Sequence, residues 1–75
     1  MKAIVTKYRG PGNVRGSRVI ADDRDGNRVT LSWDCGLNSD ENHRNAAYAL
    51  CKKMGWRGEL ATGWLGNDAV HVFLS

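Results

Sequence analysis

The fold is decided by residues 18–33, which read RVIADDRDGNRVTLSW. Apolar and polar residues alternate strictly over residues 28–33, which is the period of a β-strand with one buried face. Residues 18–22 predict a strand before it, and Asp25-Gly26 between them is a strong hairpin signal because a type I′ turn needs positive φ at both central residues. The sequence therefore predicts an antiparallel hairpin whose core-facing side chains are Val29, Leu31 and Trp33.

Three further segments predict strands around this hairpin. Residues 2–8 (KAIVTKY) are rich in β-branched and aromatic side chains, whereas residues 9–17 hold three glycines and the only proline, which predicts a loop. Residues 59–65 (ELATGWL) and 70–74 (VHVFL) predict two strands joined by a tight turn at 66–68. Because short turns join neighbouring strands, antiparallel pairing is expected.

One helix is predicted between the hairpin and the last two strands. Asn38 or Ser39 suits its N-cap, and Glu41 stands three residues after Asn38 in the position of a capping box. Gly55 suits the left-handed residue that ends a helix. The apolar stripe between these ends has helical spacing and predicts about four turns packed on the sheet. It consists of His43, Ala47, Leu50, Cys51 and Met54.

These elements give the order β-β-β-α-β-β along the chain. That order predicts an α+β fold, with an antiparallel sheet of about five strands and one helix packed on one face. The 75 residues are expected to form a single domain, residues 1–75.

The apolar segments and the cysteines favour the cytoplasm. No run of 18 apolar residues predicts a membrane span, and residues 1–7 hold no long apolar core of a secretory signal. Cys35 and Cys51 are too few for a disulfide-scaffolded secreted protein, so two reduced thiols are expected. A Cys35–Cys51 disulfide stays open as the alternative.

Charge is distributed unevenly along the chain. The first 21 residues contain no Asp or Glu but hold five basic residues, whereas the rest carries the other 6 of the 11 basic residues and all 8 acidic ones. The net charge of +3 therefore comes entirely from the N-terminal segment. Glycine and arginine beside an aromatic residue suit an anionic partner.

Nucleic acid is the partner that this segment favours. Phosphate contacts are expected from Lys7, Arg9, Arg15, Arg18 and Arg28, and Tyr8 is expected to stack on a base. In the alternative interpretation, the downstream turn residues Asp22, Asp23 and Asp25 pair with the arginines and cancel the positive field.

The sequence holds no pattern typical of an enzyme or a metal site. Cys35, His43, Cys51 and His71 lack the paired spacing of zinc ligands, and no carboxylates are paired for acid–base chemistry. No catalytic residue, metal or cofactor is therefore expected. The three tryptophans are expected mostly in the core, and an exposed Trp64 would be an anchor for a base or a protein.

Several segments resemble small uncharacterised proteins of bacterial phages and mobile elements. They are residues 6–18 (TKYRGPGNVRGSR), 25–30 (DGNRVT), 41–47 (ENHRNAA) and 50–56 (LCKKMGW), within a likeness that spans about residues 6–58. The resemblance implies an accessory gene of a mobile element, whose short products often bind nucleic acid or block a host machine. It implies no catalytic or binding residue.

The sequence therefore predicts a small non-enzymatic binding module, with nucleic acid as the first candidate partner. One alternative is a protein-binding inhibitor or modulator of a host complex, for example an anti-defence protein. Another is a structural or assembly component that pairs through an edge strand of its sheet.

Overall fold

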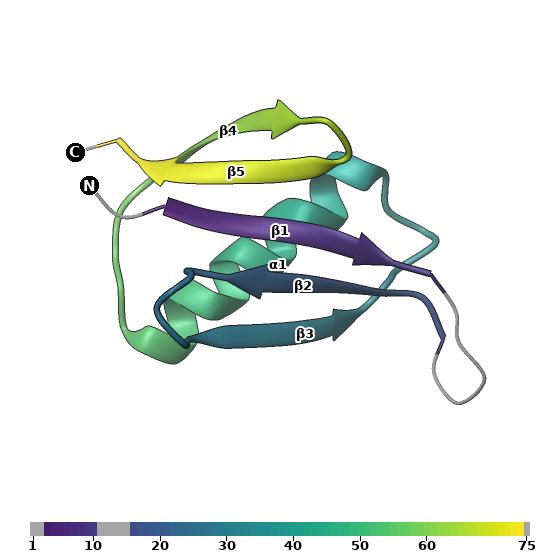
Figure 1. Ribbon diagram of the computed structural model, residues 1–75, viewed down its shortest axis with the longest axis horizontal. Coiled ribbons are helices and arrows are strands. Elements are labelled where there is room, and N and C mark those ends of the chain that lie inside the picture. Colours follow the sequence, from purple (N-terminus) through teal and green to yellow (C-terminus); the bar gives the residue numbers. More distant parts are fainter. Residues whose placement is uncertain (1–2, 11–15, 75) are drawn as a thin grey trace.

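The computed structural model describes residues 3–10 and 16–74, and these form one antiparallel sheet and one helix (Figure 1). The predicted α+β fold and its chain order are confirmed. The elements are β1 (Ala3–Arg9), β2 (Arg18–Asp22), β3 (Arg28–Ser32), α1 (Ser39–Met54), β4 (Leu60–Leu65) and β5 (Asp68–Phe73). The five strands lie in the order β3-β2-β1-β5-β4, so β1 is the central strand and β3 and β4 are the edges.

The connection between β2 and β3 is longer than predicted and comprises residues 23–27. Positive φ falls on Arg24 (65°) and Gly26 (94°), which are not consecutive. The Asp23 carboxylate accepts the backbone N–H of Asp25 at 2.8 Å, and such an Asx interaction offers the chain an alternative to a two-residue turn. The type I′ turn predicted at Asp25-Gly26 is therefore wrong, although the hairpin itself is confirmed.

Helix α1 begins and ends with the predicted caps. The Asn38 side chain accepts the backbone N–H of Glu41 at 2.8 Å, and the Glu41 side chain accepts the N–H of Asn38 at 3.3 Å, which completes a capping box. At the other end Gly55 has φ 74°, and the Trp56 N–H bonds the Cys51 carbonyl at 2.9 Å. This is the hydrogen-bond pattern of a Schellman motif, so α1 stops where the glycine permits a left-handed residue.

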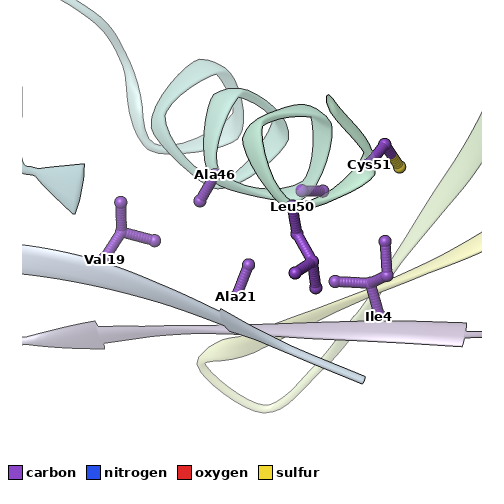
Figure 2. Close-up of a cluster of buried hydrophobic side chains, with 7 residues drawn as sticks. Ile4, Val19, Ala21, Ala46, Leu50 and Cys51 are labelled. Carbon is purple, nitrogen blue, oxygen red and sulfur yellow. The ribbon is translucent and has the colours of Figure 1, made fainter. Parts of the chain in front are cut away.

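The core lies between α1 and one face of the sheet. Figure 2 shows Ala46 and Leu50 of the helix pointing toward the side chains of β1 and β2. The buried cluster comprises Ile4, Val19, Ala21, Ala46, Ala47, Leu50 and Cys51. Three of its seven members are alanines, whose small side chains bury little apolar area. Its net contribution to stability is about 3–5 kcal/mol, as for other domains of this size.

The helix covers only part of this face. It packs on β1, β2 and β3, and it crosses behind them diagonally (Figure 1). Edge strand β4 lies beyond the helix, so Thr62 and Trp64 remain exposed although they point to the helix side. Within residues 3–10 and 16–74, no helix covers the opposite face of the sheet.

Asn42 in the second turn of α1 ties the helix to the loop that precedes it. Its side chain is almost fully buried. The amide oxygen accepts the Asp34 N–H at 2.8 Å, and the amide nitrogen donates to the carbonyls of Asp34 at 2.9 Å and Asn38 at 3.1 Å. One side chain thereby accepts the Asp34 N–H and adds a second donor to two carbonyls that already accept the backbone N–H groups of Leu37 and Asn42.

We expect Asn42→Ala to lower the free energy of unfolding by about 1–3 kcal/mol, because it removes three side-chain hydrogen bonds and takes the Asn42 acceptor from the Asp34 N–H. Urea denaturation measures the change. Asn45→Ala is the matched control, since Asn45 is exposed on the same helix, and it is expected to change stability by less than about 0.5 kcal/mol. Equal effects of the two substitutions would contradict the assigned role of Asn42.

Candidate functional site

Alternation along β1 separates the residues that were predicted to act together. Lys7 and Arg9 point to the helix-free face, and Tyr8 between them points to the helix side. The predicted stacking residue and these two predicted phosphate contacts therefore lie on opposite faces of the sheet. Arg15 lies outside the described residues.

The helix-free face carries a hollow of about 380 Å³. Four of its lining side chains are cationic and only one is acidic. The lining comprises Val5, Lys7, Arg9, Ile20, Asp22, Arg24 and Arg28. We call this the basic hollow. Three of the predicted phosphate-contacting residues, Lys7, Arg9 and Arg28, meet in it, and Arg24 joins them although the sequence interpretation had not included it.

Two ion pairs offset part of this charge. Arg28 pairs with Asp22 at 3.0 Å, and Lys7 pairs with Asp68 at 3.5 Å. The backbone N–H of Arg24 and the guanidinium of Arg28 hold the pKa of the Asp22 carboxyl below its usual value. The predicted neutralisation by the acidic turn therefore holds for Asp22 and Arg28.

Arg9 and Arg18 lie directly opposite each other on β1 and β2. Like charges in such a cross-strand pair destabilise a sheet, and an anion bound between them removes the repulsion. Neither of the two ion pairs on this face of the described residues involves Arg9 or Arg18. The register pairs Arg18 with Ser32 and Arg28 with Asp22, so Arg18 and Arg28 are not brought together.

A second concavity, of about 390 Å³, opens on the helix side at the end of the sheet where α1 begins. We call it the aromatic pocket. Its lining comprises Tyr8, Trp33, Ser39, His43, Trp64, Gly66 and Asn67. The ring centroids of Tyr8 and Trp33 are 4.8 Å apart and those of His43 and Trp64 are 4.9 Å apart, both edge to face. Trp64 is 46% exposed, so one tryptophan is accessible as the sequence had allowed.

The sequence contained part of the signal for this pocket. Tyr8 was expected in the site, and Trp33 and His43 were expected to point toward the core. Their positions at the ends of the strands and at the start of α1 bring these rings to the rim of the core. That meeting depends on the strand order β3-β2-β1-β5-β4, which the sequence pattern does not contain.

A chain of hydrogen bonds runs behind the pocket. The Thr62 hydroxyl lies 2.8 Å from Nδ1 of His71, whose Nε2 lies 2.9 Å from the Thr6 hydroxyl. That hydroxyl lies 2.7 Å from Nδ1 of His43. Thr6, His43 and His71 are fully buried. Nε2 of His43 has no hydrogen-bond partner among the described residues.

Both imidazoles are held in the neutral form. Burial lowers the pKa of His43, although its hydrogen bond with Thr6 opposes this. Burial, with His43 and Arg44 as further causes, lowers the pKa of His71 to about 4. Neutral imidazoles offer one donor and one acceptor nitrogen each, so they suit hydrogen bonding rather than the binding of an anion.

The cysteines and the remaining titratable groups form no further site in the described ranges. Cys35 is exposed, Cys51 is buried, and both are free thiols. Within residues 3–10 and 16–74, no three His, Cys, Asp or Glu side chains cluster as metal ligands would. In the same residues, no helix has the length and apolar character needed to cross a membrane.

Comparison with protein-family models, with curated proteins and with solved structures found no match to this chain. The basic hollow and the aromatic pocket are therefore the features that point to a function.

We expect stability to fall as the pH is lowered from about 6.5 toward 4. The folded pKa of His71, about 4, is below its ordinary value of 6.5, so over this range the unfolded chain binds a proton that the folded chain does not. Thermal unfolding at pH 7 and pH 5 measures the loss. His71→Gln cannot titrate and is expected to lose less stability between the two pH values, and equal losses in both proteins would contradict a neutral buried His71.

Proposed function

We propose that this protein binds nucleic acid by holding backbone phosphates in the basic hollow. The observation that carries the proposal is the gathering of Lys7, Arg9, Arg24 and Arg28 around one concavity that holds a single carboxylate, Asp22. Guanidinium groups donate in a planar fork that matches phosphate oxygens, and several of them together supply the charge that nucleic-acid affinity requires.

The existing ion pairs leave the hollow available to phosphate. The Arg28 side chain in the Asp22 pair is 64% exposed, and an exposed pair is worth at most about 1 kcal/mol. A phosphate that neutralises several cations at once therefore competes well with one carboxylate. Arg9 and Arg18 add to the attraction because their mutual repulsion is relieved when an anion binds near them.

We place this activity in the cytoplasm, where nucleic acid is present and cysteines stay reduced. The exposed free thiol of Cys35 supports this location. The origin in a phage or mobile element stays a prediction that rests on the sequence resemblance.

A second candidate function is binding to a protein through edge strand β4. The observation that favours it is the exposure of Trp64 and Leu65 next to each other on an unpaired edge, with Leu65 74% exposed. An exposed apolar edge strand is a site for pairing with another chain. A protein partner of this kind would be an inhibited host complex or a second copy in an assembly.

We expect a short single-stranded oligonucleotide to bind with an affinity that falls steeply between about 50 and about 200 mM salt, because bound phosphates release counterions. Fluorescence anisotropy measures this slope. The double variant Arg9→Gln/Arg24→Gln is expected to bind more weakly, with a slope of log K against log salt reduced by about 1.4 for two lost contacts.

Arg57→Gln is the matched control, since Arg57 is exposed outside the basic hollow. It removes one positive charge and is expected to leave most of the slope in place. Absence of binding at low salt would refute the proposed function. Binding that is equally sensitive to Arg57→Gln and to each hollow substitution would refute the hollow as its location.

A further inference from the structure

The aromatic pocket is built around a buried polar atom. Among the residues that line it, His43 has no exposed surface, and its ring lies between those of Trp33 and Trp64 at 5.9 and 4.9 Å. Because Nδ1 is turned to Thr6, Nε2 points away from the hydrogen-bond chain. A buried nitrogen without a hydrogen-bond partner lowers stability by about 1–3 kcal/mol. The presence of such a nitrogen at His43 therefore needs a structural or functional reason.

Thr6 couples the proton positions of the two histidines. Its hydroxyl has one proton and lies within hydrogen-bond distance of two imidazole nitrogens, so it donates to one and accepts from the other. When it donates to His71, Nδ1 of neutral His43 carries the ring proton and Nε2 is an acceptor. When it donates to His43, Nε2 carries the proton and is a donor. Thr62 at the exposed end adapts by rotating its hydroxyl.

We propose that the aromatic pocket takes one unpaired nucleobase, stacked on its indole rings and hydrogen-bonded at its edge to Nε2 of His43. This inference rests on the proposed function, since the base belongs to the strand whose phosphates occupy the basic hollow. Tyr8 lines the pocket, and its neighbour Arg9 lines the hollow. The two sites therefore lie on opposite faces of the sheet and adjoin at the end of β1. From Arg9 the hollow extends along the sheet to Arg24 and Arg28 at the β2–β3 turn.

The chemistry of the pocket favours a base over the other common guest of aromatic pockets, a methylated ammonium. Ser39 in the lining belongs to the first turn of α1, whose backbone N–H groups form the positive end of the helix dipole. A quaternary ammonium offers nothing to the neutral nitrogen of His43, whereas every base edge carries donors and acceptors. The volume of about 390 Å³ suits a small planar ligand.

Entry of the base requires a movement of Trp64. Nε2 of His43 has less than 1 Å² of accessible surface. Of the two indoles beside it, Trp64 is half-exposed and stands on edge strand β4, outside the area that α1 covers. Its side chain is therefore the one free to turn outward and then to close on the base.

The test compares a single-stranded oligonucleotide with an abasic strand of equal length, which keeps the phosphates and lacks the bases. We expect the whole protein to bind the ordinary strand at least fivefold more tightly, which is the usual worth of one base stacked on an aromatic ring. Trp64→Ala is expected to abolish this preference while keeping the affinity for the abasic strand. Equal binding of the two strands by the unaltered protein would overturn the inference and leave the proposed function standing.

Two substitutions assign the role of His43. His43→Phe keeps an aromatic ring and is expected to weaken binding of the ordinary strand by about three- to tenfold, as for one lost hydrogen bond. Tyr48→Ala is the matched control, since Tyr48 is a 43% exposed aromatic residue outside the pocket. This variant is expected to keep the preference for the ordinary strand over the abasic strand. An unchanged preference in His43→Phe, with a normal circular dichroism spectrum, would refute base contact by Nε2.

Nitrogen-15 spectra of the imidazoles provide a readout that does not depend on strand affinity. Protonated and unprotonated ring nitrogens have different shifts, so titration with free nucleosides is expected to move the Nε2 signal of His43. Thr6→Ser keeps the hydroxyl, so nucleoside titration is expected to shift the ring-nitrogen signals of His43 and His71 together. Thr6→Val removes the hydroxyl, and the signals of the two histidines are then expected to shift independently. If nucleosides bind but the oligonucleotide does not, the proposed function is refuted and the base-binding pocket stands. If choline binds and nucleosides do not, the nucleobase is refuted as the ligand of the pocket.

Discussion

The structure depends on how the central strand buries a hydroxyl between two histidines. β1 has a strand on each side, and Ile4 and Thr6 on its helix side are fully buried beneath α1. At Thr6 that side chain is polar, and it is satisfied only because His43 of α1 and His71 of β5 reach it from opposite directions. The hydrogen bonds thereby fix both the height of the helix over the sheet and the position of β5 beside β1.

This polar interior explains why the core is small and the site is large. The helix meets the sheet through alanines, which allow close approach but bury little apolar area. Toward the start of α1 the alanines give way to His43 and the rings of Trp33, Trp64 and Tyr8, which are too bulky to close over one another. The same element therefore supplies a tight core at one end and an open aromatic pocket at the other.

Most of the fold could be predicted from the sequence, because strand alternation, helix caps and glycines act over a few residues. The capping box at Asn38 and the end of α1 at Gly55 are examples. The site was only partly predictable, since it depends on long-range pairing. Arg24 belongs to the basic hollow because residues 23–27 form a longer turn than their Asp25-Gly26 signal indicates, and the link of His43 to His71 requires that β5 pair with β1.

Alternation, which made the fold predictable, also organises the candidate function. A β-strand sends successive side chains to opposite faces, so Tyr8 and Arg9 serve two different sites although they are adjacent in the chain. A nucleotide carries two recognisable parts, a charged phosphate and a flat aromatic base, on one flexible backbone. A nucleic-acid strand that passes around the end of β1 meets Arg9 of the basic hollow on one face of the sheet and the aromatic pocket on the other. The thickness of β1 sets the distance between these two surfaces.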